Sequence, residues 1–112
     1  MDSKFRQSIY AVMKDYKILE PYDERGRVSY TTGGVDQRKD MKITSLDEGG
    51  YEIYIDGSEI YGIDGFRKIV FGGYAKWCKD QGEVIETLKT ITPELFPMRK
   101  MSQKKVDYGW GW

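Results

Sequence analysis

A chain of 112 residues is long enough for one hydrophobic core and too short for two, which predicts a single domain over residues 1–112. Its 18 basic and 18 acidic residues cancel, and no apolar run approaches the roughly 18 to 20 residues that span a bilayer. The lack of histidine and the presence of one cysteine exclude zinc sites of the usual spacing, Ser-His and Cys-His nucleophilic pairs, and an intramolecular disulfide.

An amphipathic helix is predicted for residues 3–19, because apolar side chains recur there at helical spacing. These side chains are Phe5, Ile9, Val12, Met13 and Tyr16, and the basic residues fall mostly between them. Ser3 suits the N-cap position, and Pro21 prevents the helix from continuing much further.

From residue 27 the apolar pattern changes to a period of two, which indicates strands. Strands are predicted at residues 27–32, 41–47 and 51–56, and residues 59–63 can return as a fourth. Gly49-Gly50 separates the second predicted strand from the third, and it predicts a hairpin because the tight turns of hairpins need positive φ.

Residues 51–56 alternate between two faces. Tyr51, Ile53 and Ile55 share one face, and Glu52, Tyr54 and Asp56 share the other. The pattern predicts an antiparallel meander that packs its apolar side on a core and exposes an acidic side to water.

Residues 66–77 are predicted to form a second helix. Their apolar and small residues fall on one helical stripe, made of Phe66, Ile69, Val70, Gly73, Tyr74 and Trp77. Gly72-Gly73 lowers the helical propensity by about 1 kcal/mol per glycine, so an alternative stays open. In that alternative, residues 67–71 form a fifth strand and a helix begins only after the glycines.

A short helix is predicted at residues 83–91, with Gly82 as the C-cap of the helix before it and with Pro93 and Pro97 breaking the chain beyond it. The predicted class is α+β: an N-terminal helix, a three- to four-stranded antiparallel meander, one or two C-terminal helices packed on one sheet face, and an aromatic C-terminal arm over residues 97–112. The predicted core comprises Phe5, Ile9, Met13, Val28, Tyr30, Ile43, Tyr51, Ile53, Ile55, Phe66, Ile69, Val70, Trp77, Ile85 and Leu88.

Six acids and no basic residue lie between residues 47 and 64, namely Asp47, Glu48, Glu52, Asp56, Glu59 and Asp64. The cancelling positive charge is spread before and after this block, so the neutral chain is expected to have one face that attracts basic partners. The alternative interpretation is a solvated sheet face whose charges discourage aggregation between sheet edges.

The hypothesis that we favour is a small non-enzymatic protein-binding module. It would be an inhibitor or adaptor that occludes a basic surface, of the nucleic-acid-binding type, on a larger protein; phages carry small inhibitors of this general kind. Its contact residues would be Glu52, Tyr54, Asp56, Glu59 and Tyr61 on the meander, with Tyr108, Trp110 and Trp112 on the arm. A homodimer is also compatible with these exposed aromatic residues.

The alternative hypothesis is binding of a single-stranded nucleic acid or a nucleotide ligand. The arm places Arg99, Lys100, Lys104 and Lys105 beside its aromatic residues, which combines attraction to phosphates with rings for base stacking. Arg67, Lys68, Lys76 and Lys79 would extend this patch from the helix predicted before it. The isoelectric point near 6.3 speaks against a dedicated nucleic-acid binder.

Catalysis by carboxylates alone is the least favoured function, and no pattern for a metal or cofactor site is present. Neither Gly62–Gly65 nor Gly72-Gly73 matches a phosphate-binding fingerprint. Cys78 is predicted to be a structural thiol, since no histidine is available to activate it. A lone cysteine favours a reducing compartment, and the N-terminal segment lacks an apolar signal core, so a cytoplasmic protein without membrane contact is expected.

Overall fold

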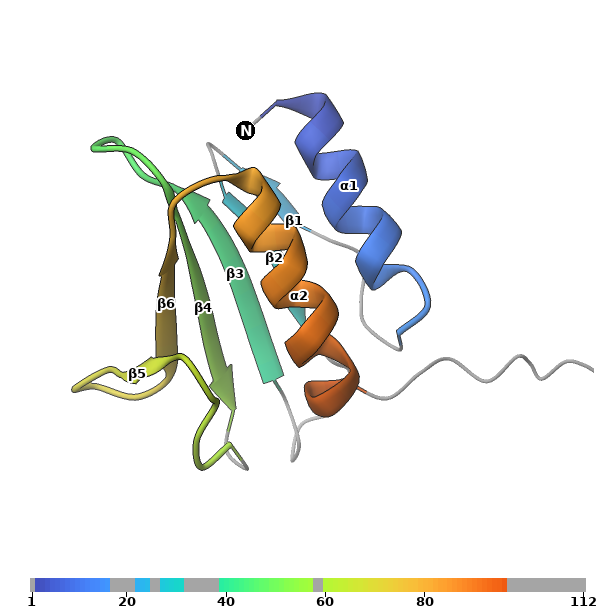
Figure 1. Ribbon diagram of the computed structural model, residues 1–112. Coiled ribbons are helices and arrows are strands. Elements are labelled where there is room, and N and C mark those ends of the chain that lie inside the picture. Colours follow the sequence, from blue (N-terminus) through green and yellow to red (C-terminus); the bar gives the residue numbers. More distant parts are fainter. Residues whose placement is uncertain (1, 17–21, 25–26, 32–38, 58–59, 97–112) are drawn as a thin grey trace, which may run out of the picture.

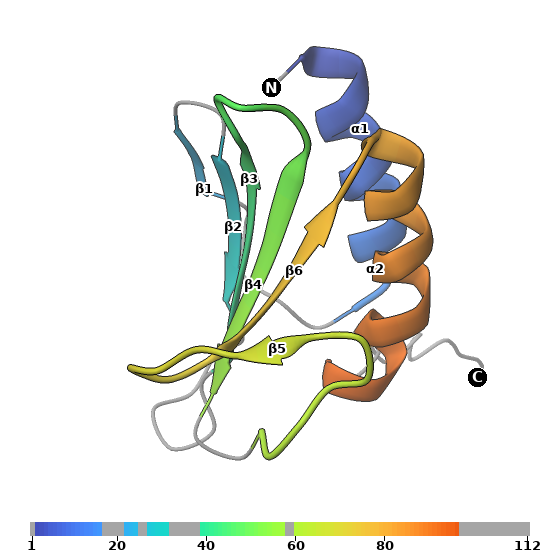
Figure 2. The same cartoon turned by 60° about the vertical axis from the view of Figure 1, so that its left-hand side comes forward.

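Two helices cover one face of an antiparallel sheet in the computed structural model (Figures 1 and 2). The structure describes residues 2–16, 22–24, 27–31, 39–57 and 60–96. Within these ranges the elements are α1 (Ser3–Met13), β1 (Tyr22–Glu24), β2 (Arg27–Thr31), β3 (Lys39–Ser45), β4 (Tyr51–Gly57), β5 (Arg67–Lys68), β6 (Tyr74–Cys78) and α2 (Gln81–Leu95). The described strands are ordered β1-β2-β3-β4-β6-β5, and every neighbouring pair is antiparallel. The α+β class is confirmed, with more strands than the three or four predicted.

The first helix buries Phe5, Ile9 and Met13, which recur every four residues along one side. Its N-cap is Asp2 rather than the predicted Ser3: the backbone is extended there, and a carboxylate oxygen of Asp2 accepts a hydrogen bond of 2.8 Å from the Phe5 N–H. The helix ends at Met13, earlier than predicted, and residues 17–19 of the predicted helix lie outside the described residues.

The hairpin predicted from Gly49-Gly50 is confirmed, because β3 and β4 pair antiparallel with Ser45 opposite Tyr51. Gly49 and Gly50 have φ values of 107° and 81°, a region that disfavours any residue with a Cβ. The alternation along β4 is also confirmed, since Ile53 and Ile55 are fully buried and the residues between them are not.

The predicted helix over residues 66–77 is wrong. This segment contains β5 and β6, joined by a turn in which Gly72 and Gly73 have φ values of 114° and 88°. The left-handed backbone at both glycines ends any helix, so the pair acts as a turn here. The alternative, a fifth strand at residues 67–71, agrees better with the structure, because residues 67–68 form a strand. The helix that follows begins only at Gln81.

Strand β6 lies beside β4, with Ile53 opposite Lys76 and Tyr51 opposite Cys78. This is the place that a returning strand at residues 59–63 would have taken. The described part of that segment, Ile60–Ile63, contains no strand. The strand that pairs with the second edge of β4 therefore comes from later in the chain than the predicted meander.

The second helix begins with a reciprocal cap. Asp80 accepts a hydrogen bond of 2.8 Å from the Glu83 N–H, and the Glu83 carboxylate accepts one of 2.8 Å from the Lys79 N–H. Gly82 therefore lies inside the first turn of α2, and its predicted role as a C-cap is wrong. The predicted break at Pro93 is wrong as well, because Pro93 lies in the last turn of a helix that continues to Leu95.

The core lies between the helices and the sheet. Its buried members are Phe5, Ile9, Met13, Val28, Tyr30, Met41, Ile43, Ile53, Ile55, Cys78, Val84, Leu88, Ile91 and Phe96. Tyr51, Phe66 and Ile85 pack against this cluster in partly buried positions, and Ile69 is also only partly buried. The prediction that Val70 and Trp77 belong to the core is wrong, since their exposed fractions are 90% and 57%.

The two helices run side by side in the same direction. The Asp2 carboxylate accepts a hydrogen bond of 3.1 Å from the Gln81 amide near their N-terminal ends, and the Thr92 hydroxyl lies 3.6 Å from the Met13 sulfur further along. The Lys39 ammonium donates to the Leu95 carbonyl at 2.8 Å, which places a cation at the negative end of α2. In the described part of the chain, neither helix is long and apolar enough to cross a membrane.

The burial pattern predicts opposite results for two apolar truncations. Ile53→Ala leaves a cavity in the core and is expected to lower the free energy of unfolding by about 2–5 kcal/mol. Val70→Ala removes an exposed side chain and is expected to change it by less than about 0.5 kcal/mol. Urea unfolding measures both, and a large loss in Val70→Ala would contradict the exposed position of Val70.

The N-cap of α1 predicts a pH dependence. The hydrogen bond from the Phe5 N–H, followed by that from the Gln81 amide, lowers the pKa of Asp2 below its ordinary 3.8. A lowered folded-state pKa stabilises the fold above the unfolded value, and this contribution is lost as the pH falls through the folded value. Asp2→Asn keeps a capping oxygen without a charge, so the stability advantage of the wild-type chain should disappear at low pH.

Thermal unfolding of both proteins between pH 2 and 7 measures this difference, and the acids common to both chains cancel in the comparison. A difference in melting temperature that is the same at every pH would show that the charge of Asp2 is not coupled to folding.

Candidate functional site

The helices leave one face of the sheet without cover (Figure 2). Because side chains alternate along a strand, the residues between the buried ones point to this side. They are Arg27 and Ser29 on β2, Asp40, Lys42 and Thr44 on β3, Glu52, Tyr54 and Asp56 on β4, and Trp77 on β6. The register places Ala75 of β6 and Arg67 of β5 on the same side, with Ala75 buried among its neighbours. We call this set the uncovered face.

The strand register places acids and cations of the uncovered face beside each other. Glu52 lies opposite Thr44 on one side and Trp77 on the other, and its carboxylate is 3.6 Å from the Arg67 guanidinium. Lys42 lies opposite Tyr54, with its ammonium 5.8 Å from the centre of the ring. The acids predicted on this face are thus interspersed with positive charges from neighbouring strands.

Tyr54 occupies the middle of the uncovered face. Its hydroxyl donates a hydrogen bond of 3.2 Å to the Gly72 carbonyl, and its ring lies directly against Gly73. Burial, and next the carboxylates of Asp56 and Asp40, raise the pKa of the phenol above its ordinary value of 10.0. The phenol therefore stays neutral near pH 7 and keeps its proton for hydrogen bonding.

Trp77 is the large exposed aromatic residue of this face. Its indole N–H donates to the Gly49 carbonyl at 3.4 Å, and its ring covers Gly50 so closely that an added Cβ there would lie 2.6 Å from the indole nitrogen. The ring is held in place, yet 57% of the residue is exposed. The predicted core position of Trp77 is therefore wrong. If residues 74–78 are taken as a strand, their alternation predicts that Trp77 lies on the other face from Tyr74 and Cys78.

The predicted contact residues are only partly brought together. Glu52, Tyr54 and Asp56 lie side by side on the uncovered face, and Tyr61 is exposed in the segment after β4. The remaining predicted residues, Glu59, Arg99, Lys100, Lys104, Lys105, Tyr108, Trp110 and Trp112, lie outside the described residues.

The four cations predicted to extend the basic arm do not lie on a helix. Arg67 and Lys68 form β5, and Lys76 is on β6 with its ammonium 3.6 Å from the Glu83 carboxylate. Lys79 follows β6 directly. Arg67 points to the uncovered face, whereas Lys76 faces α2, so these cations do not form a single patch.

The acids and the cysteine of the described ranges are candidate metal ligands and a candidate nucleophile. Those ranges contain no cluster of three or more Cys, Asp or Glu side chains placed to hold a metal ion. Cys78 is buried, and burial raises the pKa of its thiol above the ordinary value. The thiol is therefore protonated near neutral pH and has the character of a core side chain.

A second surface feature is an open groove of about 430 Å³ beside the two helices. It is lined by Ser8, Ala11, Val12, Asp15, Tyr16, Ile85 and Lys89. The groove also has polar groups, from Ser8, Asp15, Tyr16 and Lys89, but it offers one aromatic ring, whereas the uncovered face combines two aromatic rings with charges of both signs. The uncovered face is therefore the stronger candidate site.

Comparison with models of protein families, with curated proteins and with solved structures found no match to this chain. The geometry of the described residues is thus the basis for any functional proposal.

The contact between Gly73 and Tyr54 predicts that two adjacent glycines differ in their tolerance of alanine. Both have left-handed φ values, so each substitution is expected to cost about 1–2 kcal/mol in backbone strain. An added Cβ meets nothing within 4 Å at Gly72, but it would lie 2.6 Å from the Tyr54 hydroxyl at Gly73. Gly73→Ala is therefore expected to lose about 1–3 kcal/mol more than Gly72→Ala. Equal losses in urea unfolding would contradict the packing of Tyr54 on Gly73.

Proposed function

We propose that this chain is a small, non-enzymatic protein-binding module of the inhibitor or adaptor type, and that the uncovered face is its contact surface. One observation carries the proposal: Trp77 packs on Gly50 and donates to the Gly49 carbonyl on a sheet face that no described helix covers, and more than half of it is exposed. Tryptophan and tyrosine dominate the binding energy of protein interfaces, because they bury a large area at a low cost in conformational entropy. Tyr54 adds a second ordered ring on the same face.

The charges of the uncovered face indicate what the partner must present. Glu52 and Asp56, with Asp47 and Glu48 on the β3–β4 turn, favour a partner with a basic surface of the nucleic-acid-binding type. Arg67, which lies 3.6 Å from the Glu52 carboxylate, adds a cation that also favours a carboxylate or a carbonyl opposite it. A mixed pattern of this kind selects among partners more strongly than a uniformly acidic face does. The proposal includes a cytoplasmic location, which the single cysteine supports.

A second candidate function is binding of single-stranded nucleic acid. Trp77 and Tyr54 offer rings for base stacking, and Lys42 and Arg67 offer charges for phosphates. The carboxylates of Glu52 and Asp56 lie among these groups and repel a phosphate backbone. For this reason we favour a protein partner over single-stranded nucleic acid.

A charge reversal on the face tests the proposal. Tagged protein is used to recover partners from a lysate of the source cells, with and without nuclease, and the recovered partner is purified for affinity measurements. We expect one protein that survives nuclease, and we expect Glu52→Lys combined with Asp56→Lys to weaken its binding at least tenfold because both carboxylates then repel a basic surface. The far-UV circular dichroism spectrum should not change.

The matched control reverses two exposed acids on α2, with Glu86→Lys combined with Glu94→Lys. This control changes the net charge by the same amount on the opposite layer of the fold, so it should retain binding. If both double variants lose binding equally, net charge and not the uncovered face governs the interaction. Recovery that disappears with nuclease would favour the nucleic-acid alternative.

A further inference from the structure

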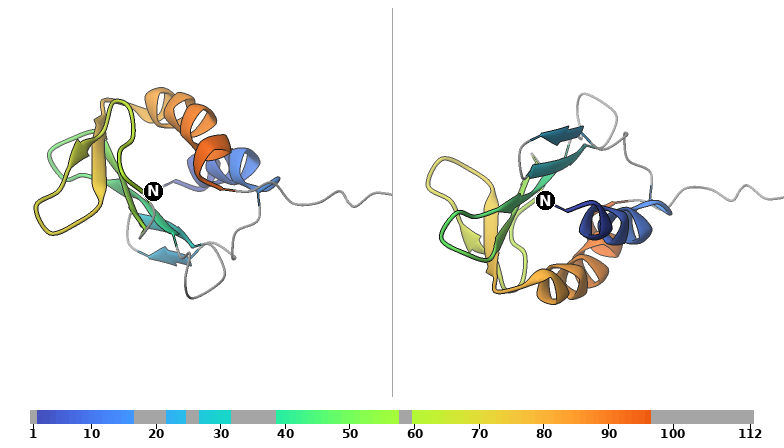
Figure 3. Two further views of the ribbon diagram at one scale, coloured as in Figure 1. Left: turned by 90° about the horizontal axis from the view of Figure 1, so that it is seen from below. Right: turned by 90° about the horizontal axis from the view of Figure 1, so that it is seen from above.

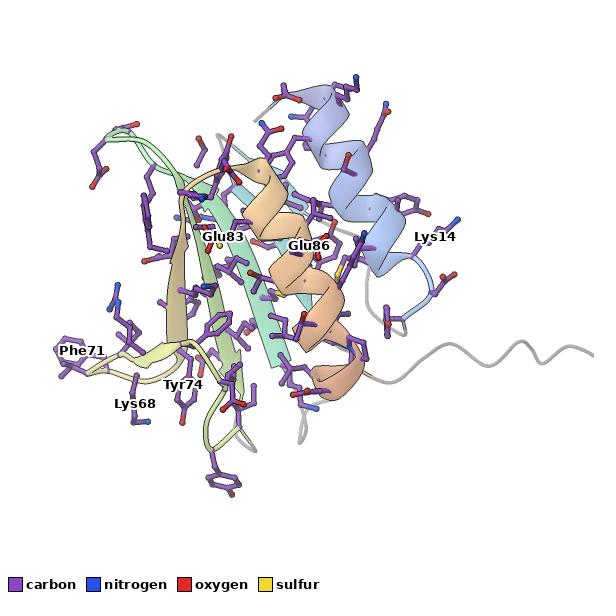
Figure 4. All side chains as sticks on the ribbon, viewed as in Figure 1. Lys14, Lys68, Phe71, Tyr74, Glu83 and Glu86 are labelled. Atoms are coloured by element: carbon purple, nitrogen blue, oxygen red, sulfur yellow. The ribbon has the colours of Figure 1, made fainter. Side chains whose placement is uncertain are left out.

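The hairpin of β5 and β6 exposes two apolar side chains at its tip. The Ile69 N–H donates to the Gly73 carbonyl at 3.0 Å, and the Gly72 N–H donates to the Ile69 carbonyl at 3.1 Å. These bonds close a tight turn that carries Val70 and Phe71, with exposed fractions of 90% and 99%. Figure 4 shows Phe71 at the outer end of the hairpin, pointing away from the body of the protein.

Contacts at the base of the hairpin hold this tip in place. The Tyr54 hydroxyl donates to the Gly72 carbonyl, and the ring of Tyr54 packs on Gly73. On the other side of the sheet, the Lys68 ammonium lies 5.1 Å from the centre of the Tyr74 ring. A turn whose backbone is already held in this way loses little backbone entropy when a partner binds it.

The hairpin borders the uncovered face. Figures 2 and 3 show that its tip projects to the side away from α1 and α2, beyond the sheet. Tyr54 belongs to the uncovered face and also contacts both glycines of the turn. A partner that covers Tyr54 and Trp77 would therefore meet Val70 and Phe71 at the edge of the same contact.

The size of the face supports a role for this edge. The strands β2, β3, β4 and β6 have 5, 7, 7 and 5 residues. With about 3.3 Å per residue and about 4.8 Å between strands, the flat part of the face has an area of roughly 380 Å². A stable interface buries about 800 Å² on each partner. The segments that border the face must therefore contribute, and the β5–β6 hairpin is the border that carries exposed apolar side chains.

The charges near the tip define the complementary surface. Residues 66–73 include Arg67 and Lys68 and contain no acid. The Glu52 carboxylate is 3.6 Å from Arg67, but this pair is largely exposed and contributes little. A pocket that suits the tip therefore has an apolar floor and carboxylates at its rim.

We propose that the β5–β6 hairpin is an anchor that inserts Phe71, with Val70 beside it, into an apolar pocket with an acidic rim on the protein that covers the uncovered face. This inference rests on the proposed function and adds an apolar anchor at the edge of its contact surface. A protein surface can place opposite charges against the cations near the tip and also against the carboxylates of Glu52 and Asp56. An anionic membrane matches only the cations and repels the acids.

Photo-crosslinking tests the proposal in the full chain. Benzoylphenylalanine is introduced by Phe71→p-benzoylphenylalanine, by Trp77→p-benzoylphenylalanine and, as a control on α1, by Tyr10→p-benzoylphenylalanine. After irradiation in the source cells, positions 71 and 77 should form adducts with the same protein, and position 10 should not. The partner peptide joined to position 71 should contain apolar residues together with Asp or Glu.

Affinity measurements with that purified partner complete the test. Val70→Ser combined with Phe71→Ser should weaken binding at least tenfold while the melting temperature stays unchanged, because both side chains are exposed in the free protein. Tyr10→Ser removes another exposed aromatic ring and should bind like the wild-type chain. Unchanged affinity in the hairpin variant would overturn the anchor.

The remaining outcomes separate this inference from the proposed function. Adducts from position 77 without adducts from position 71 would overturn the anchor and leave the proposed function in place, and no protein adduct from either position would overturn both. An adduct between two copies of the chain would replace the anchor by self-association. Lipid adducts at position 71, together with binding to phosphatidylcholine–phosphatidylserine vesicles that is lost in the hairpin variant, would replace it by membrane insertion.

Discussion

The alternation along β4 is the constraint on which both the core and the candidate site depend. Ile53 and Ile55 are fully buried against the helices, so Glu52 and Tyr54 must point to the other side. Since β4 pairs with both β3 and β6, its register also places Lys42 and Trp77 beside these residues. The composition of the uncovered face is thus a consequence of burying two isoleucines.

The elements that could be predicted from the sequence are those whose signals are local. The helix at the N-terminus has a clear period, and the alternation at residues 51–56 identifies β4 and the faces of its side chains. Gly49-Gly50 marks a hairpin because the residues on either side pair with each other, only a few positions apart. For the same reason Glu52, Tyr54 and Asp56 could be placed on an exposed face before the structure was known.

The rest depends on pairing between distant segments, which no local pattern encodes. The apolar positions of residues 66–77 fit a helical period, and within them residues 74–78 also fit a period of two. What decides between the two is the edge of β4 that β3 leaves open, because β6 pairs with that edge. A helical period therefore predicts that Trp77 and Val70 face the core, whereas the hairpin exposes both. The predicted residues of the C-terminal arm lie outside the described part of the chain, so their role stays a prediction.

Two glycine pairs connect the fold to the proposed contact surface. Each pair has the positive φ values that its turn needs, and the second glycine of each also leaves room for an aromatic ring: Gly50 for Trp77, and Gly73 for Tyr54. A side chain at either glycine would strain the turn and also displace a ring of the uncovered face. The same turns thus close the sheet and set the positions of the aromatic residues on its exposed side. Stability and binding should consequently be coupled at these two glycines, whereas the proposed anchor predicts that at Phe71 binding alone depends on the side chain.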